Sequence, residues 1–185
     1  MPTTRLLVNL LVLTLAIALS ACGSNSRDNS SEIDTMPKIT ASDRIFSQEE
    51  FLSTGFKKSK EYDVTDLTDA VSAMYGFWNP DGTEPVDYEI RFYPSHVIAV
   101  EEGKAFADEV TGENGAVSDN DVTWKEGTRD RRTSGFTSTG GGGTLAVKYA
   151  DYIIHSNVIL LCQGRESIQS LERCWALINA IGITN

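Results

Sequence analysis

The sequence predicts an α+β fold, a two-layer sandwich in which helices pack on one small, mostly antiparallel sheet. Apolar and charged residues alternate over Val86–Tyr93, which is typical of a strand. Two short apolar runs at residues 149–155 and 158–162 indicate a hairpin. Apolar residues then recur at helical spacing over residues 167–181. We therefore expect a single domain over residues 44–185.

The first 21 residues have the three parts of a secretory signal peptide. Arg5 supplies a positive charge, an apolar run extends from Leu6 to Leu19, and small residues follow up to Ala21. A helix needs about 20 apolar residues to cross a bilayer, and this run is shorter. A permanent transmembrane helix is therefore not expected here.

The signal ends in Leu-Ser-Ala-Cys at residues 19–22, which resembles the lipobox of bacterial lipoproteins. The resemblance implies cleavage before Cys22 and attachment of lipid to its sulfur. It also implies a bacterial, extracytoplasmic protein anchored to the cell membrane or the outer membrane. Gly23 replaces the aspartate that commonly retains such proteins at the inner membrane. The alternative is an ordinary signal peptide that happens to carry a cysteine near its cleavage site.

Residues 22–43 are rich in Ser, Asn and Asp and contain few apolar residues, so we expect a flexible tether. Loss of residues 1–21 removes Arg5 and no acidic residue, which changes the formal charge from −10 to −11. A chain this acidic has no electrostatic reason to bind nucleic acid.

Two helices are predicted before the first strand. Residues 47–50 fit a capping box, Phe46 and Phe51 fit its hydrophobic staple, and Gly55 ends the first helix. A second helix, beginning at Asp63, is predicted from apolar residues at helical spacing: Val64, Leu67, Val71, Met74, Tyr75 and Trp78. A basic group is expected at an exposed helix end, where it could also contact lipid headgroups: Lys57, Lys58 and Lys60.

The strand at Val86–Tyr93 is expected to have one buried face. Ser95 can cap the next helix, which ends at Gly112. The polar, Gly-rich loop at residues 112–148 is then long enough to be functional or disordered, with a short strand expected around Val122–Trp124. Within it, Gly140–Gly143 is expected to be a flexible spacer.

The hairpin is expected to turn at Ser156 and Asn157, with its second strand covered on both faces. The last helix should turn its apolar residues inward: Ile168, Leu171, Cys174, Trp175, Ile178 and Ile181. Cys162 and Cys174 then come close enough for a disulfide, although two buried free thiols are the alternative. The β-α-β-β-α order resembles a ferredoxin-like fold without its last strand. Helices would cover one sheet face, and the two N-terminal helices or a second copy of the chain would cover the other.

No catalytic or metal-binding motif is evident. His96 lies at a helix start and His155 near a turn, where it is expected to be solvated, and neither has the partners of a catalytic triad. No Cys/His cluster has zinc spacing. An acidic group lacks the spacing of a calcium loop: Asp108, Glu109, Glu113, Asp119 and Asp121. No metal and no cofactor are expected.

Basic residues gather beside a tryptophan in the long loop and are candidates for ligand binding: Trp124, Lys125, Arg129, Arg131 and Arg132. Arginine binds carboxylate or phosphate in a bidentate manner, and an indole ring can cover a cation. An anionic small molecule or an acidic protein partner would suit them. The alternative is that the arginines pair with acids of the same loop: Asp119, Asp121, Glu126 and Asp130.

Three functions fit these observations. A lipid-anchored binding or interaction protein of the bacterial envelope, without a catalytic role, is favoured by the anchor and by the lack of a catalytic motif. An extracytoplasmic enzyme of unknown reaction is the second possibility, and a deep pocket around a titratable residue would favour it. The third is an assembly subunit that forms a homodimer through an uncovered sheet face.

Overall fold

A six-stranded sheet forms the centre of the molecule in the computed structural model, which describes residues 36–79, 82–134 and 145–183. The strand order is β1-β7-β8-β4-β3-β2, with β1 parallel to β7 and all other neighbours antiparallel. The strands are β1 (Ile39–Thr40), β2 (Lys57–Tyr62), β3 (Ser72–Trp78), β4 (Val86–Phe92), β7 (Asp151–His155) and β8 (Val158–Cys162). The mixed α/β content and the mostly antiparallel sheet are confirmed. The ferredoxin-like order is not, because the sheet is larger than expected and begins inside the predicted tether.

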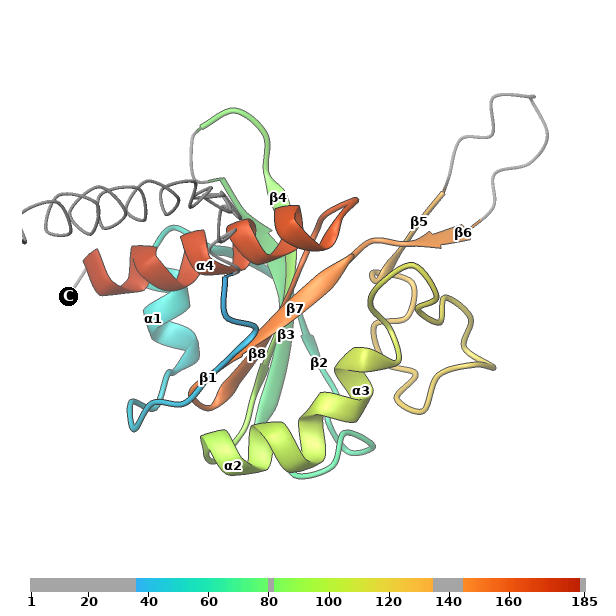
Figure 1. The fold of residues 1–185 in the computed structure, drawn as a ribbon, viewed down its shortest axis with the longest axis horizontal. Helices are drawn as coiled ribbons and strands as arrows, with labels where there is room; N and C mark the ends of the chain where they lie inside the picture. The colour runs from blue at the N-terminus through green and yellow to red at the C-terminus, as the bar shows by residue number, and fades with distance from the viewer. Residues whose placement is uncertain (1–35, 80–81, 135–144, 184–185) are drawn as a thin grey trace, which may run out of the picture. The chain divides into compact units, whose positions relative to one another are not determined.

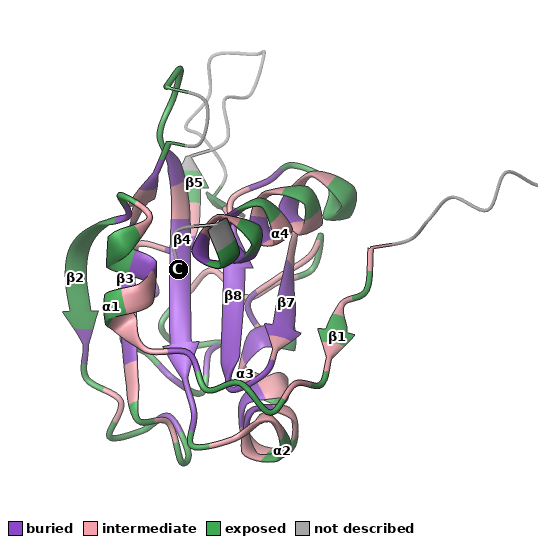
Figure 2. Ribbon diagram, turned by 90° about the vertical axis from the view of Figure 1, so that its left-hand side faces the viewer, coloured by how far each residue is buried: buried purple, intermediate pink, exposed green. Residues whose placement is uncertain are grey.

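Helices and loops cover both faces of this sheet (Figure 1). On one face lie α1 (Gln48–Ser53) and α4 (Ser167–Ile183), whose Phe51 and Ile178 share a core cluster with Leu160 of β8. The other face is covered by α2 (His96–Ile98), the π-helix η1 (Ala99–Gly103), α3 (Lys104–Asp108) and part of the long loop. Figure 2 shows the result, with the central strands β4 and β8 largely buried. A second copy of the chain is therefore not needed to cover the central strands.

The first helix has the start predicted for it. The backbone N–H of Ser47 donates to Glu50 at 2.8 Å, which forms the capping box, and the Phe46 and Phe51 ring centroids lie 6.1 Å apart. Gly55 follows the helix with a φ of +89°, a conformation in the left-handed region that favours glycine. Within the described residues, no helix combines the length and apolar character that crossing a membrane requires.

The second predicted helix is wrong, because Ser72–Trp78 forms strand β3 and the residues before it form turns. The helical spacing was coincidental: β3 is buried on both faces, so its apolar run has no strand alternation. Gly76 allows β2 and Phe56 to pack closely against β3, since a Cβ there would meet the Lys57 carbonyl of β2 and the Phe56 ring at 2.7 Å. The basic group at Lys57–Lys60 consequently lies on β2, an edge strand, and not on a helix end.

Strand β4 lies where it was predicted, but the expectation of one buried face is wrong. Its charged residues Glu89 and Arg91 are as completely buried as its apolar ones. The helix after it is interrupted by η1, and Ser95 caps its start by accepting from the Ile98 N–H at 3.3 Å.

No strand forms at residues 122–124. Instead, β5 (Arg132–Ser134) and β6 (Leu145–Val147) pair as a separate two-stranded sheet, and Gly140–Gly143 lies outside the described residues.

The C-terminal part agrees best with the sequence. The hairpin β7–β8 turns at Ser156 and Asn157, and every residue of β8 is buried. A disulfide joins Cys162 of β8 to Cys174 of α4, with their Cα atoms 5.6 Å apart, as predicted. Ile168 is an exception to the inward-facing set, because 43% of it is exposed. Cys22 and the predicted signal peptide lie outside the described residues.

Candidate functional site

A cavity of about 220 Å³ lies between edge strand β2 and the loop over residues 119–130. It is lined by Lys60, Tyr62, Asp119, Lys125, Glu126, Gly127, Thr128, Arg129 and Asp130. Two predicted ligand-binding residues, Lys125 and Arg129, are therefore brought together here. Both are exposed, and within the part of the chain that the structure describes neither side chain has a hydrogen bond or an ion pair.

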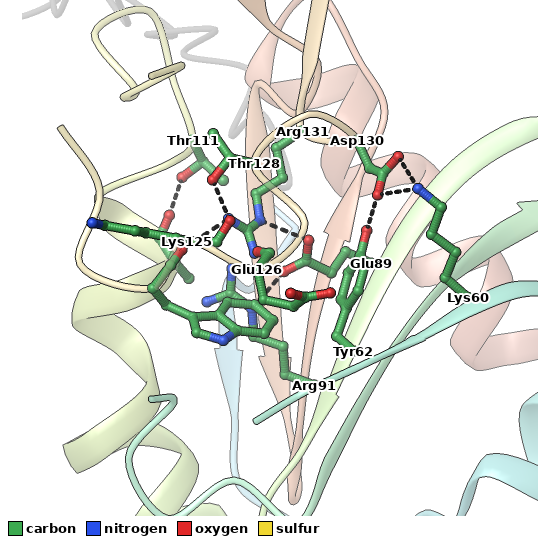
Figure 3. Close-up of polar contacts among 12 residues, drawn as sticks. Lys60, Tyr62, Glu89, Arg91, Thr111, Lys125, Glu126, Thr128, Asp130 and Arg131 are labelled. Atoms are coloured by element: carbon green, nitrogen blue, oxygen red, sulfur yellow. Dashed lines mark hydrogen bonds and ion pairs between the residues drawn. The ribbon is translucent and has the colours of Figure 1, made fainter. Parts of the chain in front are cut away.

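One wall of the cavity is a fully paired carboxylate (Figure 3). Lys60 Nζ lies 2.8 Å from both oxygens of Asp130, and Tyr62 donates its hydroxyl to Asp130 Oδ2 at 2.8 Å. Burial alone would raise the pKa of Asp130, but the bonds from Lys60 and Tyr62 hold it below its usual range. Burial, Glu89 and Asp130 raise the pKa of Tyr62 far above its usual value, so this hydroxyl stays a donor. These groups fix the wall and are not free to bind a ligand.

The loop that carries Lys125 and Arg129 is held in a compact turn. The Thr128 hydroxyl donates to the Lys125 carbonyl at 2.7 Å, and the Asp130 N–H donates to the Gly127 carbonyl at 2.9 Å. Gly127 adopts a φ of +74°, and a Cβ there would lie 2.7 Å from the Tyr62 ring. Glycine is therefore required twice over, by the turn and by the close approach to β2.

A buried ion cluster links this loop to strand β4 (Figure 3). Glu89 Oε2 accepts from Arg131 Nε at 2.8 Å, and Glu89 Oε1 accepts from Arg91 Nε at 2.7 Å. Arg131 also donates to the backbone carbonyls of Trp124, at 3.3 Å, and of Glu126. Burial alone would raise the pKa of Glu89, but the two guanidinium groups outweigh it and hold the pKa below its usual range. The cluster joins the loop to the middle of the sheet.

Trp124 completes this support. The guanidinium carbons of Arg131 and Arg91 lie 4.4 Å and 5.0 Å from its ring centroid, and its indole N–H donates to the Asp63 carbonyl at 3.1 Å. Cation–π contacts that are shielded from water contribute about 2 kcal/mol or more. Trp124 is 2% exposed, so its ring belongs to the interior and is not available to a ligand.

The predicted binding residues thus separate into two groups. Trp124 and Arg131 are buried framework residues, and Arg132 Nη1 donates to the Val117 carbonyl at 3.0 Å. Lys125 and Arg129 remain exposed at the cavity. The partner of Arg131 is Glu89, which is not among the loop acids proposed for it from the sequence.

Lys60 and Tyr62 were missed as site residues because Lys57–Lys60 was assigned to a helix end. A lysine-rich segment is also typical of an edge strand, and that signal could have placed both residues beside the loop.

A larger cavity of about 520 Å³ lies beside the connection from β3 to β4 and α4. Two of its polar groups are already used: Arg173 Nη1 donates to the Gln163 carbonyl at 2.6 Å, and Gln163 Oε1 accepts from the Asp87 N–H at 3.0 Å. None of the residues predicted to bind a ligand lines it. The smaller cavity with its two unpaired cations is therefore the better candidate site.

Neither histidine lies at this cavity. His96 Nδ1 is 2.9 Å from the Ser156 carbonyl. His155 is partly buried against the rings of Phe46 and Trp175, so the expectation of a solvated turn residue is wrong. Over the described ranges, no group of three or more His, Cys, Asp or Glu side chains is arranged to hold a metal ion.

Comparison with known proteins gives one match. No curated protein and no solved structure matches this chain. A family model described as a family of unknown function, DUF6810, matches residues 47–183, from the cap of α1 to the end of α4. The matched region includes the whole candidate site. The chain belongs to the DUF6810 family.

Proposed function

We propose that this chain is a lipid-anchored binding protein of the bacterial envelope that holds an acidic protein partner at the cavity beside β2. The lipobox-like residues 19–22 support the anchor. The disulfide between Cys162 and Cys174 is typical of an oxidising, extracytoplasmic compartment and supports export.

The observation that carries the binding role is the state of Lys125 and Arg129. Both cations are exposed and unpaired among the described residues, yet they stand on a turn fixed by Gly127 and by the buried Arg131. A preorganised loop loses little conformational entropy when it binds, so more of the contact energy appears as affinity. Two cations carried on a fixed backbone are therefore suited to receive carboxylates from a partner.

The mixture of positive and negative side chains around the cavity favours an acidic protein segment over a free anion. Asp119 and Glu126 line the same cavity as the two cations, so the local field is mixed and does not concentrate small anions strongly. A partner protein can place carboxylates against the two cations and basic groups against the two acidic side chains. Complementarity of this kind gives specificity between proteins.

Site-specific photo-crosslinking in the native bacterium tests this proposal. A photo-crosslinking amino acid at position 126, which lines the cavity and leaves both cations in place, should trap a discrete partner, and the same group at Glu101, an exposed residue of η1, should not. Arg129→Glu should reduce the product at least tenfold, because it reverses one of the two contacting charges. Lys57→Glu, a charge reversal at a cation that does not line the cavity, should leave the product unchanged. Equal trapping at positions 126 and 101, or an unaltered product in Arg129→Glu, would refute the binding role.

A further inference from the structure

Residues 36–46, here called the strap, precede the region matched by the family and lie along the outer edge of β7. Figure 2 shows its strand β1 beside β7 at one end of the sheet. The Ile154 N–H donates to the Lys38 carbonyl at 2.8 Å, and the Ser156 N–H donates to the Thr40 carbonyl at 3.1 Å. Trp175 of α4 donates its indole N–H to the Pro37 carbonyl at 3.0 Å. The first half of the strap is therefore held by its backbone.

The second half of the strap is held by the turn between β7 and β8. Asn157 accepts from the Phe46 N–H at 2.7 Å and donates to the Phe46 carbonyl at 3.1 Å. The Ser156 hydroxyl donates to the Ser42 carbonyl at 3.2 Å and also contacts the Arg44 carbonyl. Two neighbouring side chains thus hold the point at which the strap enters the domain.

His155 lies between these two sets of contacts. It is the register partner of Thr40, and its ring centroid lies 5.5 Å from that of Phe46 and 5.1 Å from that of Trp175. Its Nδ1 is buried and has no hydrogen-bond partner in the described part of the chain. The partly buried imidazole therefore lies between Phe46 of the strap and Trp175 of α4, and its Nδ1 finds no acceptor for a proton among the described residues.

The charged groups around this ring make its protonation unfavourable. Arg44 of the strap stacks on Phe46 at 4.5 Å and pairs with Glu50 of α1 at 2.6 Å, and His96 comes from α2. Lys38 of the strap pairs at 2.6 Å with Asp151, four residues before His155 on β7. The contact from α4 is the uncharged Trp175. Burial, then Arg44 and His96, hold the pKa of His155 below its usual range.

We propose that the strap is an acid-sensitive latch, which opens from β7 when His155 is protonated while the rest of the domain stays folded. Opening would hydrate the imidazolium and separate it from Arg44. In the open state the pKa returns to about 6.5, so below that pH the open state binds more protons than the closed state. Acid therefore favours opening by up to about tenfold per pH unit until the pKa of the closed state is reached, and above pH 7 the effect disappears. Opening exposes the edge of β7 and lengthens the chain between Cys22 and the domain.

Hydrogen exchange of the full mature chain, corrected for the intrinsic pH dependence of exchange, tests the latch between pH 7.5 and pH 5.0. Protection of the strap and of the Ile154 and Ser156 amides should fall as pH decreases below 6.5. The amides of β8 should keep their protection throughout. His155→Phe, which cannot be protonated and keeps an aromatic ring, should make strap protection independent of pH.

Two further variants keep the test decisive. His96→Gln removes the other histidine and should retain most of the pH dependence. Arg44→Gln removes a repelling cation and should weaken the dependence without requiring a change at His155. Equal strap protection at pH 7.5 and 5.0, the same acid effect in His155→Phe, or simultaneous loss in β8 would each overturn the latch.

Discussion

Arg131 holds residues 124–126 of the long loop against the sheet, although the sequence presents it as one more basic residue of a surface cluster. Its guanidinium reaches the fully buried Glu89 and binds two carbonyls of its own loop. Arg129, two residues away, is exposed. Neighbouring residues of one type thus have opposite roles, and the difference arises from an acidic group 42 positions earlier in the chain.

Removal of Arg131 should be among the most damaging single changes in the domain. Arg131→Met leaves Glu89 with one guanidinium partner and leaves two loop carbonyls without donors, so we expect a loss of about 3–5 kcal/mol in the free energy of unfolding. Urea unfolding measures it. Arg129→Met is the matched control and should change stability by less than about 0.5 kcal/mol. Similar losses in the two variants would show that the ion cluster does not fix the loop.

At the scale of secondary-structure elements, the sequence predicts a feature correctly where the contacts that form it join residues close in the chain. The capping box of α1, the turn at Ser156–Asn157 and the pairing of Cys162 with Cys174 each depend on residues close in sequence. Strand β3 was mistaken for a helix because both of its faces are covered by distant parts of the chain. The two buried faces of β4 were missed for the same reason, since Arg131 comes from the loop.

Gly76 of β3 allows a test of the close packing between β2 and β3. A methyl group there would meet the Lys57 carbonyl and the Phe56 ring, so Gly76→Ala should separate β2 from β3 and cost about 1–3 kcal/mol. Thermal and urea unfolding report the loss. Gly182→Ala in α4, where a Cβ meets nothing within 4 Å, should be neutral or stabilising by up to about 1 kcal/mol. A neutral Gly76→Ala variant would contradict the packing of β2 on β3.

At the scale of the whole molecule, the sequence indicated an export signal, a tether and one domain, but it placed the start of the domain too late. β1 lies inside the segment predicted to be flexible, and its polar composition hid the pairing with β7. The candidate cavity could not be predicted either. Lys60 and Asp130, which form one of its walls, are 70 residues apart and meet through the edge of the sheet.

The anchor itself is testable in cells. We expect the mature chain to enter the detergent phase after phase separation and to gain the mass of a lipid at Cys22, because acyl chains add about 0.8 kcal/mol of membrane affinity per buried methylene. Cys22→Ala should abolish the detergent partitioning and the added mass. Cys174→Ser, which changes a disulfide cysteine, should retain the partitioning and the added mass. An unmodified mature N-terminus would remove the anchor and leave the binding proposal at Lys125 and Arg129 to be judged by itself.

The parallel pairing of β1 with β7 has a mechanical consequence. A force that pulls on Met36 along the axis of β1 loads the bonds from Ile154 to Lys38 and from Ser156 to Thr40 together, in shear. Strands loaded in this way resist more tension than strands peeled apart one bond at a time. If the proposed anchor holds the chain, a pull on the domain would therefore act on β7 first, and then through β8 and β4 on the strands beside the cavity.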